Sequence, residues 1–198
     1  MKPKFLSVLL VLGMALCLAK PTEAQNKVGI KTNVLHDATA SVNLSVEYAF
    51  VPKWSFEVGG YWHPSAFNVF GNAKLNHWIV MPEVKFWFCE RFQGAFIGAH
   101  FLGGQIYAGQ FPIDFSKRFD RGVNFNTYIL DAYRTLGGGI SFGYDFVLGR
   151  HWNIELELGV GYVDAHGNEF QDGVEIYHDY HHDYVGPTKL GVSFVYLF

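Results

Sequence analysis

Charge is scarce in this sequence of 198 residues. Charged residues make up 17% of it, against roughly 25% in ordinary soluble domains. It has only 2 cysteines, too few for a disulfide-rich scaffold. The formal net charge of −3 gives no sign of the basic surface that nucleic-acid binding requires. The chain is instead rich in aromatic residues, at 18%, and has 22 glycines. This composition excludes both disorder and long coiled coils.

The first 24 residues have the features of an export signal. Lys2 and Lys4 precede an apolar run at 5–19, and Thr22 and Ala24 occupy the small-residue positions before a cleavage site. We therefore expect residues 1–24 to be a cleaved signal peptide and residues 25–198 to form one exported domain. No apolar run of 18 residues follows, so the sequence predicts no transmembrane helix.

The dominant pattern in residues 25–198 is an alternation of apolar with polar or small residues, which is typical of β-strands. Residues 41–50 place Val42, Leu44, Val46, Tyr48 and Phe50 on one face. Seven further segments alternate in the same way: 28–32, 54–63, 78–88, 95–102, 136–146, 151–161 and 190–198. The sequence therefore predicts eight strands.

The connections between these segments alternate in length. Three are short, at 51–53, 89–94 and 147–151, whereas the others include long polar segments at 103–133 and 164–186. We expect these two segments to be long outer loops. Short turns at one end and long loops at the other are typical of outer-membrane barrels whose termini lie in the periplasm.

The width of an eight-stranded barrel decides which face points inward. Its interior is only wide enough for side chains to fill, so four or five bulky residues from every strand cannot all lie inside. The bulky face must contact lipid, whereas a soluble barrel such as a lipocalin would turn it inward. We therefore predict an all-β fold, an eight-stranded antiparallel up-and-down transmembrane β-barrel, in the outer membrane of a Gram-negative bacterium.

The last predicted strand ends at Phe198 and carries apolar residues at alternate positions from Leu190 onward. This form resembles the terminal strand that the outer-membrane insertion machinery binds. We therefore expect Phe198 to be an assembly signal, and we expect outer-membrane lipid and that machinery to be partners of the chain.

Four stretches resemble a family of outer-membrane β-barrels from Bacteroidota that is known as a domain of unknown function. They are GIKTN at 29–33, NHWIVMPEVKFWFCERF at 76–92, FIGAH at 96–100 and GPTKLGVSFVYLF at 186–198. The resemblance implies an outer-membrane location and, for some relatives, an association with fimbrial or conjugative-element gene clusters. It implies no catalytic residues. Because 103–133 and 164–186 carry little of the pattern, we expect whatever is particular to this chain to lie there.

Nine charged residues fall on the predicted inward face. Paired carboxylates would suit acid–base chemistry or a proton path, but buried charges also persist simply because they are paired. We favour an interior ion network that closes the narrow barrel. Its predicted members are Lys31, Glu47, Glu57, Glu83, Lys85, Asp145, Glu155, Glu157 and Lys189.

The run YHDYHHDY at 177–184 is the most distinctive local sequence. His178, His181, His182 and Asp183 are candidate ligands for a borderline transition metal. The alternative is a polar and aromatic contact surface in an exposed loop. We favour the second interpretation and expect no cofactor.

Two functions stay open at this point. The aromatic residues of the two long segments have the composition of contact surfaces, which favours a non-enzymatic structural or interaction protein, as in adhesion. Its partner would be an appendage subunit, another surface protein or an envelope polymer. The alternative is a membrane hydrolase or acyltransferase at the outer rim, for which His63, Ser65 and His77 are the candidate residues.

Overall fold

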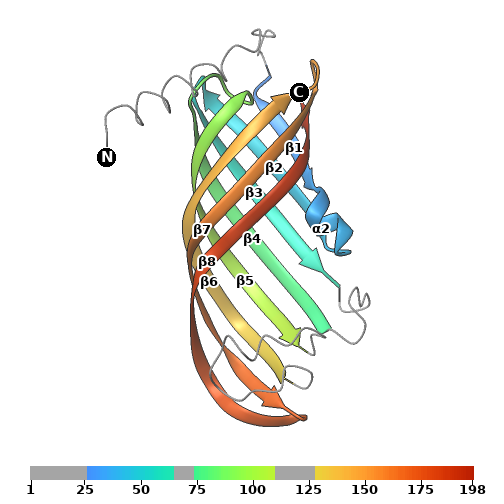
Figure 1. The fold of residues 1–198 in the computed structure, drawn as a ribbon, viewed down its shortest axis with the longest axis vertical. Coiled ribbons are helices and arrows are strands. Elements are labelled where there is room, and N and C mark those ends of the chain that lie inside the picture. The colour runs from blue at the N-terminus through green and yellow to red at the C-terminus, as the bar shows by residue number, and fades with distance from the viewer. Residues whose placement is uncertain (1–25, 65–73, 110–127) are drawn as a thin grey trace, which may run out of the picture.

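The computed structural model describes residues 26–64, 74–109 and 128–198, so the predicted signal peptide lies outside the described residues. In this part of the chain eight strands form a closed barrel in which each pairs antiparallel with its neighbours in sequence (Figure 1). The strands are β1 (Val28–Asn33), β2 (Val42–Val51), β3 (Trp54–His63), β4 (Lys74–Trp87), β5 (Gly94–Gly109), β6 (Tyr128–Val147), β7 (Trp152–Gln171) and β8 (Val174–Leu197). One short helix, α2 (Val34–Ala38), joins β1 to β2. The predicted all-β, eight-stranded antiparallel up-and-down barrel is confirmed.

No helix in the described ranges is both long enough and apolar enough to cross a bilayer. The single helix follows Asn33, whose side chain accepts a hydrogen bond from the backbone N–H of Leu35 at 3.1 Å. This cap begins a helix of 5 residues within the connection between β1 and β2.

The two ends of the barrel differ (Figure 1). At one end, which we call the turn end, residues 52–53, 88–93 and 148–151 connect β2 to β3, β4 to β5 and β6 to β7. The first residue of β1 and the last of β8 also lie at the turn end. The opposite end, which we call the loop end, holds α2 and the turn at 172–173 that joins β7 to β8.

Each strand directs alternate side chains inward, and the inward ones are mostly polar or charged. In β2, for example, Asn43, Ser45 and Glu47 are buried, whereas Val42 and Leu44 are 62% and 56% exposed. The exposed face therefore consists largely of apolar side chains, the reverse of a soluble protein. This distribution follows from the width of the barrel, because eight strands leave room inside for one layer of packed side chains.

Aromatic side chains form two outward rings on this apolar surface. Phe50, Trp54, Phe88, Trp152 and Phe198 are exposed near the turn end, and Trp62, Trp78, Phe101 and Tyr162 are exposed near the loop end. Such girdles mark the two interfaces of a membrane-spanning barrel.

The wall of the barrel is much higher on one side than on the other. β1 has 6 residues, whereas β6 and β7 have 20 each and β8 has 24. The loop-end parts of these three long strands (residues 128–134, 163–171 and 174–184) stand beyond the loop-end aromatic ring, and we call them the projection (Figure 1).

The segment 164–186 is therefore a strand hairpin where we expected an irregular outer loop. Its turn consists of Asp172 and Gly173, whose φ angles of +53° and +79° suit the tight turn that Asp-Gly pairs form between strands. Within the second predicted loop, 103–109 and 128–133 are also strand, and 110–127 lies outside the described residues. These residues form strands because the neighbouring strand provides hydrogen-bond partners for their backbone N–H and C=O groups.

Among the described residues, two apolar clusters lie within the interior, one on each side of the charged residues. Near the turn end, an apolar cluster packs Trp87 against Phe92 and Phe96, with Ala49, Val195 and Leu197 beside them. Near the loop end, a second apolar cluster consists of Tyr61, Met81 and Leu102. The charged residues lie between these clusters, so apolar packing closes the charged layer on both sides.

Glycine provides the room for this packing where neighbouring strands come very close. A Cβ at Gly139 would lie 2.3 Å from the carbonyl oxygen of Val160, and one at Gly161 would lie 2.2 Å from that of Gly138. Real Cβ atoms do not approach backbone so closely. Larger residues at these two positions would force β6 and β7 apart.

Candidate functional site

The strand register, as well as the sequence, decides which charged side chains meet inside the barrel. Glu47 pairs with Glu57 across β2 and β3, and Glu57 pairs with Glu83 across β3 and β4. Three carboxylates therefore stand side by side on the inner wall. Like charges placed directly opposite each other repel, so this row requires cations from elsewhere in the barrel.

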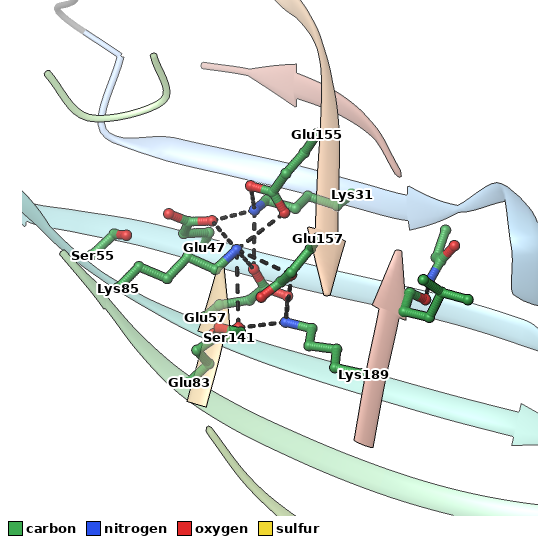
Figure 2. Close-up of polar contacts among 12 residues, drawn as sticks. Lys31, Glu47, Ser55, Glu57, Glu83, Lys85, Ser141, Glu155, Glu157 and Lys189 are labelled. Carbon is green, nitrogen blue, oxygen red and sulfur yellow. Dashed lines mark hydrogen bonds and ion pairs between the residues drawn. The ribbon is translucent and has the colours of Figure 1, made fainter. Parts of the chain in front are cut away.

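Three lysines supply those cations (Figure 2). The Lys85 Nζ lies 2.8 Å from Glu57, 3.0 Å from Glu155 and 3.6 Å from both Glu47 and Glu157. The other two lysines contact three carboxylates each. Lys31 pairs with Glu47, Glu57 and Glu155. Lys189 pairs with Glu57, Glu83 and Glu157. We call these eight residues the ion network.

The ion network is almost fully shielded from solvent. Lys85 and Glu47 are 0% exposed, and Lys189, the most accessible member, is 9% exposed. The Lys85 ammonium also lies 4.4 Å from the centre of the Phe96 ring. The ion network stabilises the folded barrel only while all its members are present, because a buried charge that loses its partner lowers the free energy of unfolding.

Asp145 is the one predicted member that stands apart. It is buried at 1% exposure and pairs in register with Glu155, yet it takes part in none of these ion pairs. Its polar neighbour is the side chain of Asn153, which is also buried. Ser141, by contrast, was not predicted, and its hydroxyl donates to Glu83 of the network.

Sequence reasoning also missed that residues 139–143 match the spacing Gly-x-Ser-x-Gly of hydrolase nucleophiles. The structure places Ser141 in the middle of β6, where it is fully buried and hydrogen-bonded to Glu83. A hydrolase nucleophile sits instead on a sharp strand-to-helix turn with its hydroxyl exposed. Residues 139–143 therefore match the sequence of that motif but not its geometry.

The rim residues proposed for an enzyme come together only in part. His63 and His77 are paired in register between β3 and β4, with ring centres 5.8 Å apart, and both are buried. Ser65 lies outside the described residues. A second ring contact at this end joins His36 of α2 to Tyr61, with centres 4.7 Å apart.

The four candidate metal ligands separate once the hairpin is formed. His178 lies 2.7 Å from Glu175, and His182 pairs with Glu169 and contacts the Tyr180 ring. His181 and Asp183 flank His182 and lie on the opposite face of the hairpin from it, where His181 Nε2 is 2.6 Å from Asp164 and 3.4 Å from Asp183.

His166 also joins that group, with its ring stacked on His181 at 4.6 Å. Asp164 and His166 were not among the predicted candidates. Asp172-Gly173 indicates the hairpin, but two register shifts between this turn and His166 decide that His166 faces His181, and the sequence carries no signal for them.

Elsewhere on the projection, the phenol of Tyr133 donates a hydrogen bond to Asp179. This hydrogen bond raises the pKa of Tyr133 above its usual value, because removing the phenol proton would place two negative charges together. An open groove of about 280 Å³ lies beside Tyr133 at the loop end. Trp78, Tyr107 and Asp131 are among the residues that line it.

A closed ring of eight antiparallel strands, apolar outside and charged inside, defines this molecule as a membrane-spanning β-barrel. Within that class, the chain belongs to the family described as protein of unknown function DUF3575, whose model matches residues 8–198.

Among solved structures, the chain is similar to the NMR solution structure of the E. coli Outer Membrane Protein W. The two share 13% sequence identity with a TM-score of 0.44, and the match covers 87% of this chain and 98% of that one. None of the curated proteins matches this chain.

Proposed function

We propose that this protein is exported by its signal peptide and resides in the outer membrane of a Gram-negative bacterium as a non-enzymatic anchor. The apolar outer face and the two aromatic rings support this placement. Strands β2 and β3 have 10 residues each, which fits the roughly 9–11 residues that a tilted strand needs to cross a bilayer. The turn end then faces the periplasm and the loop end faces outward.

The barrel serves as an anchor because its interior is filled. The ion network lies between two apolar clusters, and eight strands leave no space for a wide aqueous channel. The carboxylates that acid–base catalysis would require are already paired with lysines inside this sealed layer. These contacts favour a structural role for the interior over catalysis or transport.

The observation that carries the proposed function is the projection. Tyr133, Tyr177 and Tyr184 are about half exposed on it, at 46%, 52% and 46%, and crossing a membrane does not require them. Tyrosine is enriched at protein interfaces, and segments that extend from a rigid scaffold commonly hold binding residues. We infer that the projection contacts an appendage subunit, another surface protein or an envelope polymer.

The register of the hairpin offers a precise way to remove this surface. Asp164 pairs with Asp183, so replacing residues 165–182 by Asn-Gly leaves β7 and β8 in register, because two-residue Asn-Gly turns suit such hairpins. A photo-reactive amino acid in place of Tyr184 is retained in both forms. In intact cells we expect the full-length protein to give a discrete cross-linked adduct and the shortened one to lose it.

The control places the photo-reactive residue at Leu156, which is exposed on the lipid-facing surface of the barrel. It should give the same lipid adducts in both forms and so show that the shortened barrel is inserted. The proposed function would be wrong if the shortened protein kept the discrete adduct. It would also be wrong if positions 133, 177 and 184 all gave no adduct in the full-length protein.

A further inference from the structure

The hairpin brings four metal-ligating side chains to one face of the projection. Asp164 and His166 are two residues apart on β7, and His181 and Asp183 are two residues apart on β8. The register pairs Asp164 with Asp183 and His166 with His181. Because side chains two residues apart on a strand share a face, the four form a square block just beyond Tyr162.

The ligand atoms within this block converge. His181 Nε2 lies 2.6 Å from one oxygen of Asp164, and His166 Nε2 lies 3.1 Å from the other. The two imidazole rings stack with centres 4.6 Å apart and planes 16° apart, and both Nε2 atoms contact the same carboxylate. One ligand atom from each of Asp164, His166 and His181 lies within 4.8 Å of the others.

We propose that Asp164, His166 and His181, with Asp183 as the fourth ligand, bind a divalent borderline transition cation of the Zn²⁺ class. Two imidazole nitrogens with carboxylate oxygens are a donor set that such ions accept in four-coordinate sites. An alkaline-earth ion would require oxygen ligands throughout. Ligands from both β7 and β8 make the bound cation a cross-link between the two strands outside the bilayer.

Neighbouring groups orient the ligands of this site. The Tyr162 hydroxyl donates to Asp183, and Asp179 lies 4.0 Å from His166 Nδ1, the nitrogen that faces away from the cation. Carboxylates and hydroxyls in these positions hold metal ligands in place. Arg134 acts in the opposite direction, because its guanidinium lies 3.8 Å from Asp164 and competes with a cation for that carboxylate.

This site goes beyond the proposed function and does not depend on any partner of the projection. The competing interpretation is that two histidines simply pair with one aspartate in the absence of metal. The two interpretations differ in what Arg134 does. As a metal site, the block should bind Zn²⁺ more tightly without that positive charge, whereas a plain ion-pair cluster should bind none with or without it.

The test uses the full barrel, purified in detergent without a histidine tag, and measures Zn²⁺ affinity by titration calorimetry. We expect His166→Ala and His181→Ala each to weaken binding by at least about tenfold, because even the loss of an outer partner of a metal ligand costs that much. His178→Ala is the matched control, since His178 lies in the same hairpin but pairs with Glu175 away from the site. Its affinity should equal that of the unchanged protein.

Two further measurements distinguish loss of the metal site from misfolding of a variant. Arg134→Gln should tighten binding by about fivefold, because a cation would no longer compete with the attraction of unit charges at the 3.8 Å spacing of Arg134 and Asp164 in water, and a misfolded variant would not gain affinity. Co²⁺ in place of Zn²⁺ should give the intense visible absorption of a four-coordinate site, and His166→Ala should lose it. Absence of Zn²⁺ binding to the unchanged protein, or an equal loss in His178→Ala, would overturn the proposal.

Discussion

Replacing Lys85 should destabilise the barrel more than replacing any other lysine in the described chain. Its side chain is fully buried, and its Nζ lies within 4.0 Å of five glutamates. In Lys85→Met a side chain of similar length keeps the space filled, but only Lys31 and Lys189 then neutralise those carboxylates. Removing one partner of a buried pair costs about 3–5 kcal/mol. The folding equilibrium should therefore fall by about 150- to 5,000-fold.

Unfolding in urea, followed by tryptophan fluorescence of the barrel in detergent micelles, measures this loss. The mobility shift between boiled and unboiled gel samples gives a second readout. Lys27→Met is the control, because it makes the same substitution at an exposed lysine and should leave the midpoint unchanged. Adding Glu157→Gln to Lys85→Met should recover part of the stability, since it removes one of the five carboxylates that Lys31 and Lys189 must then neutralise alone. If Lys85→Met unfolded at the midpoint of Lys27→Met, the reasoning about the ion network would be refuted.

Three other predictions follow from the fold. Gly139→Ala should lower the free energy of unfolding by about 1–3 kcal/mol through overpacking, whereas Gly149→Ala should not, because no atom lies within 4 Å of the added Cβ. An equal effect at both positions would contradict the close approach of β6 and β7. Deleting Phe198, whose ring is 58% exposed at the end of β8, should reduce the amount of folded barrel in outer-membrane fractions; an unchanged yield would contradict its role as an assembly signal. The purified protein should show no large steady conductance in planar bilayers, and stable wide channels would show that the interior is open.

Alternation made the membrane-crossing part of the fold predictable. Each of the eight predicted segments overlaps a strand, and the predicted 54–63 coincides with β3. The inward residues could be predicted as well, because barrel width leaves only one consistent choice of face. All nine charged residues assigned to the interior are buried.

Alternation does not show which inward residues of neighbouring strands lie at the same level along the barrel axis. Asp145 has the same kind of side chain and the same orientation as the members of the ion network, but register places it against Glu155 and outside the ion pairs. Relative strand positions depend on how the whole ring closes, which no single segment encodes. For the same reason sequence did not pair Ser141 with Glu83.

The projection escaped prediction for a different reason. Strands that stand free of the lipid have no face that must be apolar, so residues 164–186 lack the periodic pattern that marks the buried parts. Its polar composition suggested a loop. Only the Asp172-Gly173 pair indicates a hairpin, and the register shifts that bring Asp164 and His166 opposite Asp183 and His181 leave no mark in the sequence.

The short β1 has a consequence for the other end of the ring. β1 pairs with β8 only from Ser193 to Leu197, and Asn33 binds the β8 backbone at Leu190 and Val192. Among the described residues, β8 beyond these contacts has a strand neighbour on one side only, so its other side is the edge of a sheet, and α2 contacts only part of it. Pro187 provides no backbone donor there, and Asp179, at a φ of +51°, interrupts the strand with a charge. Such features oppose pairing between edges. Without them, this edge would be open to pairing with the same edge of a second barrel, which would join the two projections into one sheet.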